Sequence, residues 1–155
     1  MRQNVILGTT VILALAVCAQ GQTEDNSKCG NDTLKGAYGV QLSGTRPAPF
    51  VALGGPGYVG QMEQVIGFDI LVFDGKGNFT QVDNIKGTVS GFPPDRPGKG
   101  TYVVNPDCSV ITTIQPAPGV TVVTKAVIVD GGKEYRGFTV SPEAINITFV
   151  GRQIK

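Results

Sequence analysis

Short apolar segments that alternate with turn-forming residues constrain this chain most strongly. Eight segments are rich in β-branched and aromatic residues, and none carries an apolar stripe of helical length. In several of them apolar and polar residues alternate, as in the run from Ile145 to Phe149. Such alternation indicates a sheet with one buried face. The expected strands are Leu34–Ser43, Val65–Phe73, Asn78–Ser90, Thr101–Val104, Val110–Ile114, Val120–Val129, Glu134–Val140 and Ala144–Val150.

The connections between these segments are alternately long and short. The short ones contain Asp74-Gly75, Asn105-Pro106 and Asp130-Gly131, and Asp-Gly pairs supply the positive φ that tight hairpins need. An even number of sequentially paired strands can close into a barrel, which removes the exposed sheet edges. We therefore expect an all-β fold, an eight-stranded antiparallel up-and-down barrel over residues 34–155, with a two-sheet β-sandwich as the alternative.

The N-terminus has the pattern of a secretory signal peptide. Arg2 is followed by the apolar run Val5–Val17 and then by small residues. The run is shorter than the about 20 residues that a membrane-spanning helix needs. We expect a signal peptide over residues 1–21, an N-terminal segment over 22–33, and a secreted or periplasmic protein without a membrane span. Lipid anchoring through Cys18 is the alternative.

Composition excludes several classes of function. The chain contains no His, so His-dependent catalysis and His-based metal sites are ruled out. The formal net charge is +1, and basic and acidic residues balance once Arg2 leaves with the leader. A balanced chain gives no electrostatic reason to expect nucleic acid as a partner. We expect no metal and no cofactor.

Two cysteines remain after the leader, Cys29 and Cys108. An even pair in an exported protein is most simply a disulfide. Cys29 precedes the first expected strand, and Cys108 lies in the turn between the fourth and fifth. In an up-and-down meander both positions fall at the same end of the sheet, so we expect these residues to be bonded.

Three pieces of the sequence resemble a known family: CGNDTLKGAYGVQLSG, FDGKGNF and GTYVVNPDCS. They are similar to small secreted bacterial proteins whose domain is like the allene oxide cyclase barrel, which is related in fold to dirigent proteins. The shared motifs are mainly turn glycines and core hydrophobics. The resemblance implies a barrel, and it points to isomerisation of a lipid-like substrate in an apolar cavity. It identifies no catalytic residue in this chain.

The long connections, including Gly44–Gln64 and Gly91–Gly100, all belong to the end opposite the expected disulfide. Loops mounted on a scaffold often carry function, and small barrels bind ligands through their mouths. We therefore expect a ligand site at this long-loop rim. The candidate ligand-binding residues are Tyr38, Phe50, Leu53, Tyr58 and Phe92.

Asp69 is the strongest candidate for acid–base chemistry. It shares one face of its strand with Leu71 and Phe73, and burial among apolar neighbours would raise its pKa. The interpretation that we favour turns the other face, with Phe68 and Val72, toward the core. Asp69 is then a surface charge.

Three other polar residues also allow two interpretations each. Glu63 could lie at the mouth, but a solvated loop acid is favoured. Arg136 could bind a carboxylated ligand, but a surface pair with a carboxylate on a neighbouring strand is favoured. Tyr38 could point its hydroxyl into a cavity, whereas a core tyrosine with one hydrogen-bond partner is the default.

Three hypotheses of function follow. The favoured one is an exported, non-enzymatic barrel that binds a small apolar or amphipathic ligand at the long-loop rim. The second is an isomerase or cyclase that acts on a lipid-like substrate in an apolar cavity without metal or His. The third is a homo-oligomer in which exposed apolar strand faces pack between subunits. A solidly packed interior would remove the first two.

Overall fold

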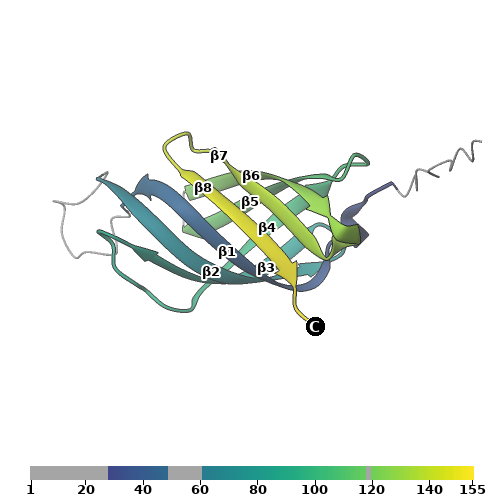
Figure 1. Ribbon diagram of the computed structural model, residues 1–155, viewed down its shortest axis with the longest axis horizontal. Helices are drawn as coiled ribbons and strands as arrows, with labels where there is room; N and C mark the ends of the chain where they lie inside the picture. Colours follow the sequence, from purple (N-terminus) through teal and green to yellow (C-terminus); the bar gives the residue numbers. More distant parts are fainter. Residues whose placement is uncertain (1–27, 49–60, 118–119) are drawn as a thin grey trace, which may run out of the picture.

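The chain folds into a closed eight-stranded antiparallel barrel with its strands in sequential order (Figure 1). The computed structural model describes residues 28–48, 61–117 and 120–155. The sheet closes because β1 (Lys35–Pro47) pairs with both β2 (Met62–Asp74) and β8 (Asn146–Gln153). The barrel prediction is confirmed, and the sandwich alternative is wrong. The remaining strands are β3 (Asn78–Gly87), β4 (Arg96–Val104), β5 (Ser109–Ala117), β6 (Val120–Val129) and β7 (Glu134–Ser141).

Alternation along each strand separates the interior of the barrel from its surface, and β2 shows this most clearly. Asp69, Leu71 and Phe73 are buried, whereas Phe68 and Val72 are exposed. The favoured interpretation, which turned Phe68 and Val72 toward the core, is therefore wrong. Both faces of β2 carry apolar residues. The alternation therefore indicated a strand but did not indicate which of its faces lies inside the barrel.

An aromatic cluster fills one half of the interior. It consists of Tyr38, Phe73, Phe79, Tyr102, Tyr135 and Phe149, with centroid separations between 4.9 and 5.7 Å for the contacting rings. Most contacts are edge-to-face, the arrangement that aromatic quadrupoles favour. The Tyr38 hydroxyl donates a hydrogen bond to the Gly132 carbonyl oxygen, and the Tyr102 hydroxyl bonds to the carbonyl oxygens of Asn31 and Leu34 at 2.9 Å. The prediction that Tyr38 is a core residue is confirmed.

A disulfide lies at the same end of the barrel as this cluster. Cys29 and Cys108 are bonded, with their Cα atoms 5.0 Å apart, and both pack against the aromatic core. Two 3-10 turns, η1 (Asn31–Thr33) and η4 (Asp130–Gly132), also belong to this end. The predicted disulfide is confirmed.

The main error in the predicted strand boundaries concerns β4. It begins at Arg96, whereas the sequence placed its start at Thr101. The added residues pair with β3, with Arg96 opposite Asp83 and Gly100 opposite Phe79. A Cβ on Gly100 would lie 2.4 Å from Cζ of Phe79, so glycine is needed here to make room for the ring. Glycine-rich sequence that resembles a loop is therefore inner barrel wall.

At the other end, β1 and β2 extend further toward the rim than predicted, and Arg46 pairs with Glu63 in their register. Glu63 lies within β2 and is buried. Its interpretation as a solvated loop acid is therefore wrong.

The predicted signal peptide and the alternative anchor Cys18 lie outside the described residues, as does half of the predicted segment 22–33. Within the described ranges, no helix has the length and apolar character needed to cross a membrane.

Candidate functional site

The half of the barrel beyond the aromatic cluster contains a cavity of about 400 Å³. Its wall includes Arg46, Pro47 and Pro142 near the ends of the strands that meet the long connections. This volume falls within the roughly 300–1,000 Å³ typical of small-molecule sites. All eight strands contribute to the wall, which is predominantly aliphatic. Its aliphatic side chains include Val40, Leu42, Leu71, Ile85, Ile114 and Val122.

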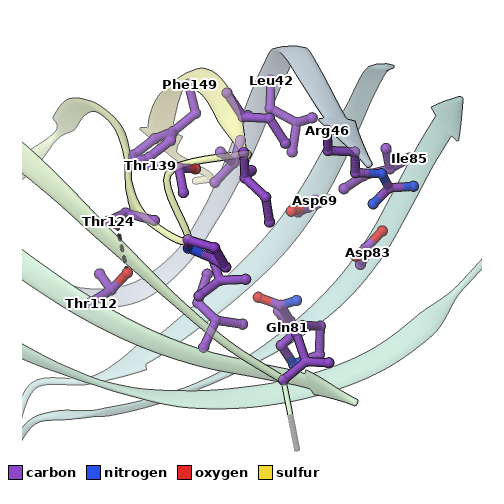
Figure 2. A pocket seen from close by; sticks show the side chains of 18 of the residues that line it. Leu42, Arg46, Asp69, Gln81, Asp83, Ile85, Thr112, Thr124, Thr139 and Phe149 are labelled. Carbon is purple, nitrogen blue, oxygen red and sulfur yellow. Dashed lines mark hydrogen bonds between the residues drawn. The ribbon is translucent and has the colours of Figure 1, made fainter. Parts of the chain in front are cut away.

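Polar groups are concentrated on β2, β3 and β4. Asp69, Gln81, Asp83 and Arg96 all line the cavity, and Figure 2 shows Asp69 and Asp83 on neighbouring strands. Strand register places these two carboxylates directly opposite each other. The Nη2 atom of Arg96 donates to both carboxylate oxygens of Asp83, at 2.8 Å each. Arg96 and Asp83 therefore form an ion pair in the cavity wall.

Asp69 has much weaker support for its charge. Its hydrogen bond within the described part of the chain comes from the backbone N of Asn84, at 3.3 Å. Burial raises the pKa of Asp69 to about 7, and the negative charge of Asp83 adds to the rise, against smaller opposing effects of Asn84 and Arg96. Near neutral pH, Asp69 can therefore carry a proton and donate a hydrogen bond into the cavity.

A second polar pair lies across the barrel, on β5 and β6. The Oγ1 atoms of Thr112 and Thr124 are 2.7 Å apart (Figure 2), and both residues are buried in the cavity wall. Each hydroxyl can donate and accept, so this pair satisfies itself. It adds polarity without adding charge.

Glu63 links neighbouring segments at the rim near the cavity through hydrogen bonds. It accepts hydrogen bonds from Arg46 Nε at 2.9 Å, Ser90 N at 2.8 Å and Ser90 Oγ at 2.9 Å. Burial acts to raise the pKa of Glu63, but the hydrogen bonds from Ser90 and Arg46 outweigh it and lower that pKa. The ionised carboxylate thus joins β1, β2 and the segment after β3, and it neutralises Arg46.

The structure describes two of the five residues that the sequence proposed for ligand binding, Tyr38 and Phe92. Tyr38 lies in the aromatic core, and Phe92 is 52% exposed; neither lines the cavity. Phe50, Leu53 and Tyr58 lie outside the described residues.

Sequence reasoning singled out Asp69 but missed its neighbours Asp83 and Arg96. Asp83 carried a usable signal, because it alternates with Gln81 and Ile85 on one face of its strand. No sequence signal marked Arg96 as a cavity residue, because it lies in a proline- and glycine-rich stretch that resembles a loop.

Arg136 has no place in this site. It donates to Glu134 on its own strand, and Arg152 Nε donates to the same carboxylate at 2.6 Å. The prediction that Arg136 pairs with a carboxylate is confirmed, but the predicted partner on a neighbouring strand is wrong, because Glu134 lies on β7 with Arg136.

The described residues contain no group of three or more Cys, Asp or Glu side chains that could hold a metal ion. Comparisons of the chain with models of known protein families, with curated proteins and with solved structures give no match. The resemblance to the allene oxide cyclase barrel therefore stays a prediction, and the candidate site rests on its own geometry.

Proposed function

We propose that this protein is an exported β-barrel that binds one small apolar or amphipathic ligand inside the barrel. The cavity of about 400 Å³ is the observation that carries this proposal. Its aliphatic wall supplies the driving force for an apolar ligand, and its few polar groups would orient that ligand. The Cys29–Cys108 disulfide is compatible with an extracellular or periplasmic location.

The cavity is not a necessary result of the strand number. Eight strands enclose an interior that side chains can fill, and the aromatic cluster fills the other half of this same barrel. An empty apolar cavity costs stability because the atoms that line it lose packing contacts. A ligand would restore those contacts, so binding offsets a cost that a solid core would avoid.

Two substitutions on β5 test this proposal with a matched control. Ile114 lines the cavity, and Ile111 on the same strand faces outward. We expect Ile114→Trp to fill part of the cavity and abolish binding of the neutral fluorescent probe N-phenyl-1-naphthylamine. Ile111→Trp should bind the probe like the wild type. Fluorescence titration of folded protein checks both, with folding verified by circular dichroism.

Absence of probe binding to the wild-type protein would contradict the proposal. Equal binding by the two variants would also contradict it, because the probe would then lie outside the cavity.

The second candidate function is an isomerase or cyclase that acts on a lipid-like substrate. Asp69 favours it, because a carboxylic acid in an apolar cavity can transfer a proton at neutral pH, while the wall positions the substrate. Conversion of a ligand to an isomer of the same elemental composition separates this candidate from binding alone.

A further inference from the structure

The two carboxylates in the cavity wall have unequal surroundings. Asp69 is 8% exposed and Asp83 is 7% exposed, and they face each other on β2 and β3. Asp83 takes two short hydrogen bonds from Arg96, whereas Asp69 takes one long bond from a backbone amide. Two adjacent buried carboxylates cannot both ionise at low cost, and the one without a cation keeps its proton more strongly.

The cations in the cavity wall are already neutralised. Among the described residues that line it, the cations are Arg46 and Arg96. Arg46 pairs with Glu63 at 2.9 Å, and Arg96 pairs with Asp83 at 2.8 Å. A ligand that carried a carboxylate would therefore find no free cation in the described wall, and it would be repelled by any charge on Asp69.

Unused hydrogen-bond donors remain beside these pairs. The Nε atom of Arg96 is buried and has no hydrogen-bond partner among the described residues. Burying a donor without an acceptor is unfavourable, so such groups call for an explanation. A protonated Asp69 adds an O–H donor on the same side of the cavity. An uncharged oxygen atom on a ligand would satisfy this kind of donor.

We propose that Asp69, as an un-ionised carboxylic acid, donates a hydrogen bond to an uncharged oxygen of the ligand. The ligand class is then an apolar molecule with a ketone, ether or alcohol oxygen, and not a fatty carboxylate. This inference rests on the proposed binding function and names the chemistry of the ligand's polar end.

The hydrogen bond makes binding pH-dependent. The charged or titratable groups that face Asp69 are Asp83 from β3, Arg96 from β4 and Tyr135 from β7. On β1, the Tyr38 hydroxyl is engaged by the Gly132 carbonyl. Burial raises the pKa of both tyrosines, so they stay neutral as Asp69 titrates. The Asp69 donor is present below its pKa of about 7 and is lost above it.

Two probes of equal chain length test the proposal: 2-nonanone, which is neutral, and nonanoate, which is anionic. Their affinities are measured by displacement of N-phenyl-1-naphthylamine at about pH 6 and about pH 8.5, on either side of the Asp69 pKa. At the lower pH the wild type should bind 2-nonanone about three- to tenfold more tightly than nonanoate. The affinity for 2-nonanone should fall by a similar factor at the higher pH.

Two variants isolate the role of Asp69. Asp69→Asn keeps a donor that does not titrate, so its affinity for 2-nonanone should be independent of pH. Asp69→Leu has no donor, so its affinity for the ketone should be low at both pH values.

Tighter binding of nonanoate than of 2-nonanone by the wild type at the lower pH would overturn the assignment to Asp69. A wild-type affinity for 2-nonanone that does not change with pH would overturn it as well. Either result would leave ligand binding in the cavity standing. Failure of the wild type to bind N-phenyl-1-naphthylamine or either nine-carbon probe would overturn the proposed function and this inference together.

Discussion

Two buried acids on one face of β2 show how neighbouring groups decide the protonation state of a side chain. Glu63 and Asp69 are both shielded from solvent. Glu63 lies among donors from Arg46, Ser90 and Val89, and these hydrogen bonds overcome the effect of burial and lower its pKa. At Asp69 burial prevails and raises the pKa to about 7. The first carboxylate is suited to holding the rim, and the second is suited to exchanging a proton.

Asp69 should destabilise the folded protein at alkaline pH. The pKa of an aspartate in an unfolded chain is about 3.9, so between about pH 4 and pH 7 the folded state holds a proton that the unfolded chain has lost. The free energy of unfolding therefore decreases as pH rises through this window and is lowest above pH 7. We expect Asp69→Asn to raise it by about 2–4 kcal/mol at pH 8 and by little at pH 4.

Urea denaturation of the wild type and the variant at the two pH values measures this difference. An equal effect of Asp69→Asn at both pH values would show that the carboxyl does not titrate between them.

At the scale of the strand, glycines on the inner face determine how large rings fit inside the barrel. A Cβ on Gly151 of β8 would lie 2.2 Å from Cε1 of Tyr135 on β7, and a Cβ on Gly100 would meet Phe79. Small residues opposite large ones allow the wall to come close to the rings. The aromatic cluster thus depends on positions that have no side chain.

Gly151→Ala should therefore destabilise the barrel. The added methyl group would overlap the Tyr135 ring, and overpacking of this kind costs about 1–3 kcal/mol. Gly39→Ala is the control, because Gly39 is a strand glycine whose Cβ would make ordinary contacts of 3.8 Å with Ile154. We expect the control to change the free energy of unfolding by less than about 1 kcal/mol. Urea denaturation compares the two, and an equal effect would contradict the steric explanation.

Local patterns in the sequence predicted the elements better than they predicted the site. Alternation and tight turns gave the barrel, and β6 has the predicted bounds, Val120–Val129. Arg96 was missed because β4 is held in the sheet by pairing with β3, which lies earlier in the sequence. In that pairing Gly98 lies against Gln81 and Gly100 against Phe79. The inner face of β2 was assigned wrongly because Asp69 looked unsuitable for a core. Its burial becomes intelligible once a cavity is present beside it.

At the scale of the whole molecule, the barrel has two different ends. One is filled by aromatic rings and cross-linked by Cys29–Cys108, and the other holds the cavity. On its outside, β2 exposes Ile66, Phe68 and Ile70. The prediction of a homo-oligomer stays a prediction, since such a face is compatible with burial between subunits.

Removing the disulfide should weaken the fold while leaving the cavity intact. The bond joins residues 79 positions apart, and a loop of this length contributes about 3–5 kcal/mol in the chain-entropy account. We expect the double variant Cys29→Ser, Cys108→Ser to lose about that much free energy of unfolding. Its affinity for N-phenyl-1-naphthylamine should stay at the wild-type value. Urea denaturation and fluorescence titration measure the two quantities. An unchanged free energy of unfolding would contradict the prediction.

The end filled by the aromatic cluster also limits how long a ligand the cavity can hold. The rings of Tyr135 and Phe149 border both the cavity and the aromatic cluster. In the proposed binding mode, a linear ligand that entered from the end with the cavity would stop at these rings. Each methylene that fits above these rings adds about 0.8 kcal/mol of burial. Each one beyond the rim adds nothing. Within a series of linear ligands that differ only in chain length, affinity should therefore increase with length and then level off. The length at which it levels off measures the depth of the cavity.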